Sequence, residues 1–207
     1  MPKTFFCHGR ILTDGKVLEN GYIVLNHIPS EGRLELKDSI EAVGSMDDGK
    51  MPEPDAGDVV YDVSGYTLMP GLVDVNTRLD IHAGTPPYAY DELGVPYRTL
   101  VSFRHASEAL WEGVTTLRTA GMPDGIDLAL KQSYGKYLAQ GPELITSGPE
   151  YIPHGGLDHN IYRKKQCSGP DAFRGAARYE NSKGVQSMHL GVTGERVRRL
   201  QGEPELQ

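Results

Sequence analysis

The sequence predicts an α/β protein with a parallel sheet, preceded by a small β-rich unit. Three observations predict this fold class. Residues 1–69 alternate short β-like runs with turns, a Pro-Gly pair at residues 70 and 71 ends that pattern, and strands then alternate with helices. Such alternation is typical of parallel sheets, because each helix returns the chain to the end of the sheet at which the strand began.

The β-rich unit is expected to span residues 1–69 as a small β-sandwich-type domain. Asp14-Gly15 and Asn20-Gly21 both separate β-like runs, and both are strong hairpin signals. Residues 29–58 are polar and rich in turn residues, with one expected strand, SIEAVG. The run VVYDVSGYTLMPG then returns to β character.

The α/β part is expected to span residues 70–194. It opens with the strand LVDV, followed by the helix RTLVSFRHASEALWEG, which stops at Gly113. The strand VTTLRTAG, the helix GIDLALKQSYGKYLAQG and the strand PELITSGPE come next. A helix opened by Pro170 and closed by Gly184 leads to the last strand, VQSMHLGVTG. Residues 195–207 are expected to form a charged tail.

Composition and charge exclude several classes of function. The 207-residue chain has a formal net charge of −7, which argues against nucleic-acid binding. The sequence has neither a signal-peptide pattern nor a long apolar run, so we expect a cytoplasmic protein without a membrane partner. Cys7 and Cys167 lack a C-x-x-C pattern and are expected to stay reduced.

The order of several motifs resembles the amidohydrolase superfamily, in particular its imidazolonepropionase and prolidase-like branch. An N-terminal β-unit is followed by LMPGLVD, EGVTTLR, SGPE and SGPDAFRGAAR, and the resemblance runs from about residue 8 to residue 194. It implies a (β/α)₈ TIM barrel with a β-sandwich, and hydrolysis of amide and other C–N bonds with divalent metals. Since a TIM barrel takes about 250 residues, residues 71–194 would form about four βα units, a partial barrel.

The resemblance also implies where metal ligands should lie. The family places a His-x-His pair after its first barrel strand, and this sequence has Asn76 and Arg78 at those positions. Asn is a poor ligand for zinc, and Arg stays protonated in proteins. A metal-bridging lysine at the end of the fourth strand corresponds to His189. Metal-assisted hydrolysis needs neutral imidazoles and carboxylates, so no metal and no other cofactor is expected.

Polar residues at the strand ends are the candidates for any remaining chemistry. His154 and His159 follow the third strand, where the family has a Gly-Gly-His loop near its substrate; ordinary loop histidines are the alternative. An arginine acting with histidines can stabilise a carboxylate or an enolate and move protons. The candidate residues are the catalytic Arg78, His154 and His189 and the substrate-binding Asn76 and His159.

For some of the polar residues in this part of the sequence a purely structural role is the alternative. Arg78 would be structural if it pairs with Asp74 or Asp80 and holds an inactive site together. Asp124 and Asp127 open a predicted helix, where anions are favoured, so we interpret both as capping residues.

Three functions remain open from the sequence. The chain is a degenerate hydrolase that binds a small molecule or acts as a scaffold, a metal-independent enzyme for a small acidic or carbonyl substrate, or a hydrolase that another chain completes. Edge strands near residues 72–76 and 185–191 would leave unpaired backbone groups, which favours a homo-oligomer or a completing partner chain.

Overall fold

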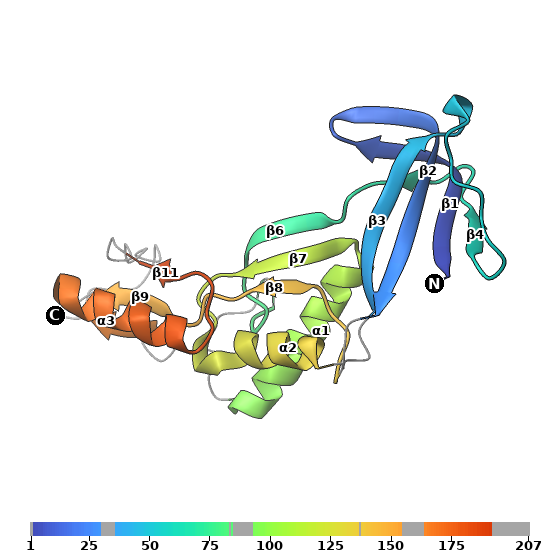
Figure 1. Ribbon diagram of the computed structural model, residues 1–207. Helices are drawn as coiled ribbons and strands as arrows, with labels where there is room; N and C mark the ends of the chain where they lie inside the picture. Colours follow the sequence, from blue (N-terminus) through green and yellow to red (C-terminus); the bar gives the residue numbers. More distant parts are fainter. Residues whose placement is uncertain are drawn as a thin grey trace. The chain divides into compact units, whose positions relative to one another are not determined.

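A five-stranded sheet forms the part of the chain up to Pro70 in the computed structural model (Figure 1). The structure describes residues 2–29, 36–82, 84, 93–136, 138–154 and 164–191. The strand order is β3-β2-β1-β4, and β5 also pairs with β1. Neighbours among β1, β2 and β3 are antiparallel, whereas β4 and β5 run parallel to β1. The elements are β1 (Lys3–Thr13), β2 (Lys16–Pro29), β3 (Leu36–Ser45), η1 (Met46–Asp48), β4 (Val59–Asp62) and β5 (Thr67–Leu68).

The first predicted hairpin is confirmed and the second is wrong. Asp14 and Gly15 join β1 to β2 with φ of 47° and 70°, the positive values that a tight two-residue hairpin turn requires. Gly21 instead lies inside β2, paired with Gly9 and Ser45. A Cβ atom at Gly21 would lie 2.5 Å from Ile11 Cδ1, so this glycine permits close packing and makes no turn.

The second unit, Gly71–Gln207, alternates strands and helices as predicted (Figure 1). Two three-stranded parallel sheets occur in it, in the orders β6-β7-β8 and β10-β9-β11. Its first elements are β6 (Leu72–Thr77), α1 (Val95–Trp111), β7 (Val114–Thr119), η3 (Pro123–Gly125), α2 (Ile126–Gly135) and β8 (Glu143–Ile145). Then follow β9 (Glu150–Pro153), β10 (Lys164–Cys167), α3 (Gly169–Ser182) and β11 (His189–Leu190). The mixed α/β architecture is therefore confirmed.

Two details of this unit differ from the prediction. The third predicted strand, PELITSGPE, ends early as β8, and a further strand, β9, begins at its last residue, Glu150; Gly148 lies between the two strands with φ of 61°. The strand β10 was not predicted, since its sequence KKQC is polar. It forms because its backbone pairs in parallel with β9, which depends little on side-chain type.

An apolar core joins the helices α1 and α2 to the sheet β6-β7-β8. Leu117 of β7 and Leu144 of β8 are almost fully buried and pack in one cluster with helix residues. Burying a leucine side chain contributes about 1.5–3 kcal/mol, so this cluster holds α1 and α2 against β7 and β8. The cluster comprises Leu79, Ala106, Leu117, Met122, Ile126, Leu130 and Leu144.

A buried carboxylate fixes α3 against the second sheet. Glu180 of α3 is 1% exposed and accepts a hydrogen bond of 2.6 Å from Tyr151 Oη of β9. Lys183 Nζ lies 2.6 Å from its other carboxylate oxygen. Burial alone would raise the pKa of Glu180, but the bonds from Lys183 and Tyr151 outweigh it and hold that pKa below its ordinary value. Along the described ranges, no helix has the length and apolar character needed to cross a membrane.

Candidate functional site

A row of ionisable side chains crosses the sheet β10-β9-β11 at the level of Glu150. The strand register places Lys164 of β10 on one side of Glu150 and His189 of β11 on the other. Residues paired across neighbouring strands project from the same face of a sheet, so the three side chains lie next to one another. Lys164 Nζ is 3.4 Å from Glu150 Oε2.

Arg78 approaches the same carboxylate from the end of β6. Its Nη2 donates a hydrogen bond of 2.8 Å to Glu150 Oε2. The side chains of Glu150 and Lys164 are 9% and 6% exposed, and that of Arg78 is 28% exposed. Because charges attract more strongly where water is excluded, Glu150 is firmly held between two cations. Arg78 thus has Glu150 as its partner, a residue that the sequence alone does not single out.

Two glycines make room for this ion pair. Gly121 follows β7 with φ of +75°, and a Cβ atom there would lie 3.0 Å from Glu150 Cβ and 3.5 Å from Arg78 Nη2. A Cβ atom at Gly191 would lie 2.9 Å from Glu150 Oε1. The backbone therefore encloses the carboxylate from two sides, and a side chain at either position would displace it.

The surroundings of His189 disfavour the protonated form of its imidazole. Burial lowers its pKa below the ordinary 6.5, the Glu150 carboxylate partly opposes this, and the cations of Arg78, Arg118 and Lys164 lower the pKa further. Arg118, on β7, also donates a hydrogen bond of 3.1 Å to the Val75 carbonyl. Three positive charges and one negative charge thus act on His189, which leaves positive charge in excess.

These side chains do not fit a divalent metal. Arg78 carries a fixed positive charge at one ligand position implied by the family, and His189, at another, is surrounded by cations that would repel a metal ion. Asn76 is exposed, and its backbone N–H donates to Asp74 Oδ1 at 2.9 Å. Within the described part of the chain, no three His, Cys, Asp or Glu side chains gather closely enough to hold a metal.

The structure places His154 away from the row. It follows β9, four residues beyond Glu150, which corresponds to roughly 13 Å along an extended strand. Its Nδ1 is 2.7 Å from Ser168 Oγ, and its backbone N–H donates to the Cys167 carbonyl. Of the predicted site residues, Arg78 and His189 therefore converge on Glu150, and His154 lies elsewhere. The predicted His159 lies outside the described residues.

A second buried carboxylate lies where β7 and β8 end. Asp127 Oδ2 accepts hydrogen bonds from Thr119 Oγ1, Ser147 N and Gly148 N at 2.9, 2.9 and 3.0 Å. Asp127 lies in the first turn of α2, the place where an anion was expected, but the N-cap itself is Gly125, so Asp127 is not the capping residue.

The capping interpretation of Asp124 is also wrong. Its carboxylate lies 2.5 Å from Nη2 of Arg98, a residue of α1. Asp124 has φ of 61° and belongs to η3, ahead of the helix whose N-terminus it was expected to cap. Its charge therefore ties η3 to α1.

Sequence reasoning misses Glu150 and Lys164, the two residues that complete the row. Glu150 stands in the SGPE motif and Lys164 in the polar stretch KKQC, where no strand is predicted. Glu150 is the first residue of β9, whereas functional residues of parallel sheets are sought at the carboxyl ends of the strands, so no signal in the sequence pointed to it. Lys164 had no signal either, because its place depends on the pairing of β10 with β9.

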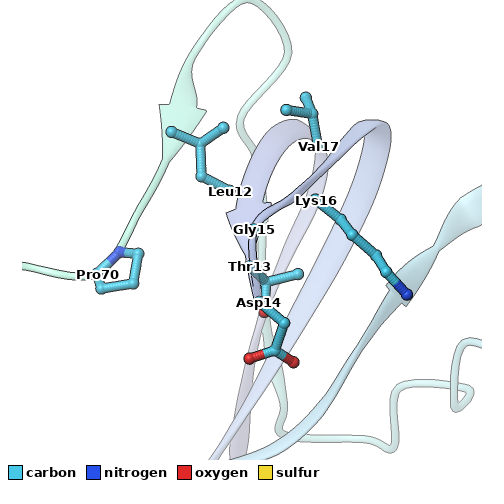
Figure 2. A pocket seen from close by; sticks show the side chains of 7 residues that line it. All are labelled: Leu12, Thr13, Asp14, Gly15, Lys16, Val17 and Pro70. Carbon is cyan, nitrogen blue, oxygen red and sulfur yellow. The ribbon is translucent and has the colours of Figure 1, made fainter.

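Two surface hollows lie apart from the row. One, of about 370 Å³, lies beside the β1–β2 hairpin, and Figure 2 shows the Lys16 side chain extending away from Pro70. The other, of about 210 Å³, lies at the end of α3 and is lined in part by Glu180 and Met188. Neither hollow is lined by Arg78, Glu150 or His189. The first is lined by Leu12, Thr13, Asp14, Gly15, Lys16, Val17 and Pro70.

The whole architecture matches solved structures of hydrolases. An A. niger ochratoxinase aligns with a TM-score of 0.75 and 18% identity, over 96% of this chain and 48% of that one. A Xaa-Pro dipeptidase with methionine bound in its active site aligns with a TM-score of 0.71 and 19% identity, over 93% and 47% of the two chains. An amidohydrolase aligns with a TM-score of 0.71 and 23% identity, over 91% and 46%.

This chain has an amidohydrolase fold. The resemblance inferred from the sequence motifs is thereby confirmed in three dimensions. No protein-family model and no curated protein sequence matches the chain. At identities below 25% these amidohydrolase-fold structures establish the fold alone, and the chain spans about half of their length.

Proposed function

We propose that this chain is an amidohydrolase-superfamily protein that binds a small carboxylate-bearing molecule at its strand ends without a metal. The observation that carries this proposal is the Arg78–Glu150 ion pair within a cluster that has excess positive charge. A cation stands where the family relies on neutral metal ligands. The positive charge of a metal centre is thus replaced by guanidinium and ammonium groups of the protein.

The chemistry of Arg78 favours a carboxylate as the ligand. A guanidinium has five N–H donors in a planar fork that matches the two oxygens of a carboxylate. Its contact with Glu150 is a single hydrogen bond from Nη2, so the other donors of the fork are not used by this pair. Glu150 itself shows that a carboxylate fits between Arg78 and Lys164.

A solved structure of the same fold supports the ligand class. The Xaa-Pro dipeptidase holds methionine in its active site, and methionine carries a carboxylate. The sites of TIM barrels lie at the carboxyl ends of their strands. Arg78 directly follows β6 and therefore lies at the carboxyl end of that strand.

Titration calorimetry with methionine, succinate and acetate tests the proposal, with methylammonium as a ligand of opposite charge. We expect at least one acid to bind, and the Arg78→Ala variant to bind it at least about tenfold more weakly, a loss of about 1.4 kcal/mol. Arg78→Lys should give an intermediate affinity, because it keeps the charge and loses the fork.

The matched control is Arg174→Ala. Arg174 is an exposed arginine of α3 that pairs with Asp171 at 2.6 Å, so its removal changes net charge by the same amount. We expect this variant to bind the acid as the wild type does. Binding of no acid, or equal weakening by both alanine variants, would overturn the proposal. Circular dichroism of each variant shows that it is folded.

A further inference from the structure

Arg118 is a second arginine at the strand ends, and no acidic side chain neutralises it in the described part of the chain. It is the next-to-last residue of β7 and is half-buried. Its Nη1 donates a hydrogen bond of 3.1 Å to the Val75 carbonyl, so its guanidinium lies against β6, the strand that Arg78 follows. Arg78 donates to Glu150, whereas Arg118 forms no salt bridge with any described residue.

The acidic residues of the two neighbouring strands do not face Arg118. Leu117 packs in the core with helix residues, and because alternate residues of a strand project to opposite faces, Arg118 projects from the other face. Asp74 of β6 is paired with Leu117 and therefore shares the helix-covered face. Glu143 of β8 is paired with Thr116, two residues before Arg118, which corresponds to about 7 Å along the strand.

Arg78 and Arg118 act on one site from separate anchors. Both charges lower the pKa of the same imidazole, that of His189. Glu150 anchors Arg78 and the Val75 carbonyl anchors Arg118, in each case through one nitrogen. Val75 and Arg78 are three residues apart, which corresponds to roughly 10 Å along an extended strand. Each guanidinium therefore keeps N–H donors for a ligand at its own place beside β6.

We propose that the ligand of this site is a short dicarboxylate, of the size of succinate or glutarate, with one carboxylate on Arg78 and the other on Arg118. This inference rests on the proposed function and narrows its ligand class. Among the charged groups of the site, Arg78, Arg118 and Lys164 against Glu150 leave two positive charges, which a dianion balances. The separate anchors favour two carboxylates over one compact dianion, because each fork binds a carboxylate of its own.

Titration calorimetry of the full chain at constant ionic strength tests this inference. Succinate and glutarate are compared with butyrate, a monocarboxylate of similar size, and with sulfate, a compact dianion. We expect one of the two dicarboxylates to bind at least about tenfold more tightly than butyrate and sulfate. Arg118→Ala should weaken that dicarboxylate about tenfold and change the affinity for butyrate by no more than about twofold.

Two further variants separate the roles of the arginines. Arg78→Ala should weaken butyrate and the dicarboxylate alike, because both ligands place a carboxylate on Arg78. Arg118→Lys should bind the dicarboxylate with intermediate affinity, since it keeps the charge and loses the fork. The exposed Arg174→Ala is the matched control and should bind every ligand as the wild type does. Circular dichroism of each variant shows that it is folded.

The inference is overturned if butyrate or sulfate binds as tightly as both dicarboxylates. It is equally overturned if Arg118→Ala leaves dicarboxylate binding unchanged, or weakens butyrate by the same factor. In these cases the proposed function stands as long as Arg78→Ala weakens the acid that binds. Binding of no acid at all would instead overturn the proposed function, and this inference with it.

Discussion

Two carboxylates at the strand ends of the second unit are both buried, yet they are held in opposite ways. Asp127 is fully buried and accepts hydrogen bonds from neutral donors, the Thr119 hydroxyl and the backbone of Ser147 and Gly148. Glu150 lies between the charged groups of Arg78 and Lys164. The charge of Asp127 is therefore stabilised by neutral donors, whereas the charge of Glu150 neutralises part of the positive charge of Arg78 and Lys164.

The difference is our basis for proposing a binding role for the site around Glu150 and a structural role for Asp127. The donors around Asp127 lie on the strand ends themselves, so its hydrogen bonds join β7 to the turn after β8. The cations around Glu150 exceed it in charge, and such a site attracts anions from solution. The two carboxylates therefore differ through their hydrogen-bond donors, which are neutral around Asp127 and charged around Glu150.

The largest effect is expected from Asp127→Ala. The substitution removes the acceptor shared by three buried donors and leaves a space in the buried network. Ser147 N and the Thr119 hydroxyl keep weaker or shared acceptors, whereas Gly148 N loses its acceptor, and an unsatisfied buried donor costs about 1–3 kcal/mol. We expect the free energy of unfolding to fall by roughly 4 kcal/mol, measured by denaturant titration. Asp127→Asn keeps one acceptor oxygen and should lose less. A loss below about 1 kcal/mol for Asp127→Ala would show that these hydrogen bonds contribute little to the stability of the fold.

Glu150→Ala is expected to lower the free energy of unfolding by less than Asp127→Ala does, and an added ligand should reverse part of that loss. Arg78 and Lys164 then lack their carboxylate, which should cost roughly 3 kcal/mol. Added acetate should restore part of the stability, because a carboxylate that binds the folded state stabilises it by mass action. Thermal unfolding in acetate and in chloride at equal ionic strength measures this. If chloride raised the unfolding temperature of Glu150→Ala as much as acetate does, the distinction between the two sites would be lost. The same holds if acetate raised the unfolding temperature of Asp127→Ala equally.

The smallest effect is expected on the pH dependence of stability, through His189. The pKa of His189 in the folded protein lies below the ordinary 6.5, so the unfolded chain binds this proton more readily. The resulting stability is fully present above pH 6.5 and is lost as the pH falls from 6.5 through the folded pKa. His189→Gln should make the unfolding midpoint less dependent on pH in this window. Identical pH profiles for the two proteins would contradict the assignment.

Local signals in the sequence predicted local structure well. The Asp14-Gly15 turn and the alternation of strands and helices depend on neighbouring residues, and both are present. Asn20-Gly21 misled, because its glycine serves a packing contact with Ile11 across the sheet. A turn signal cannot be told from a packing glycine without knowing what lies opposite.

The candidate site was predictable in part. The positions of Arg78 and His189 follow from their strand ends, and they do converge. Glu150 is separated from Arg78 by 72 residues, and β10 exists through its pairing with β9, so neither could be inferred from nearby sequence. The donors of Asp127 likewise come from two other segments of the chain. Long-range contacts decide which strand-end residues form a site.

The central claim is that an ion pair, and not a metal, occupies the strand-end centre of this amidohydrolase fold. Elemental analysis of the purified protein after dialysis tests it most directly, following expression in medium that contains zinc, manganese and nickel. We predict well under one tightly bound metal per chain, because the fixed charge of Arg78 and the cations around His189 repel a divalent ion. One metal per chain that survives dialysis and is lost in His189→Ala would contradict the account.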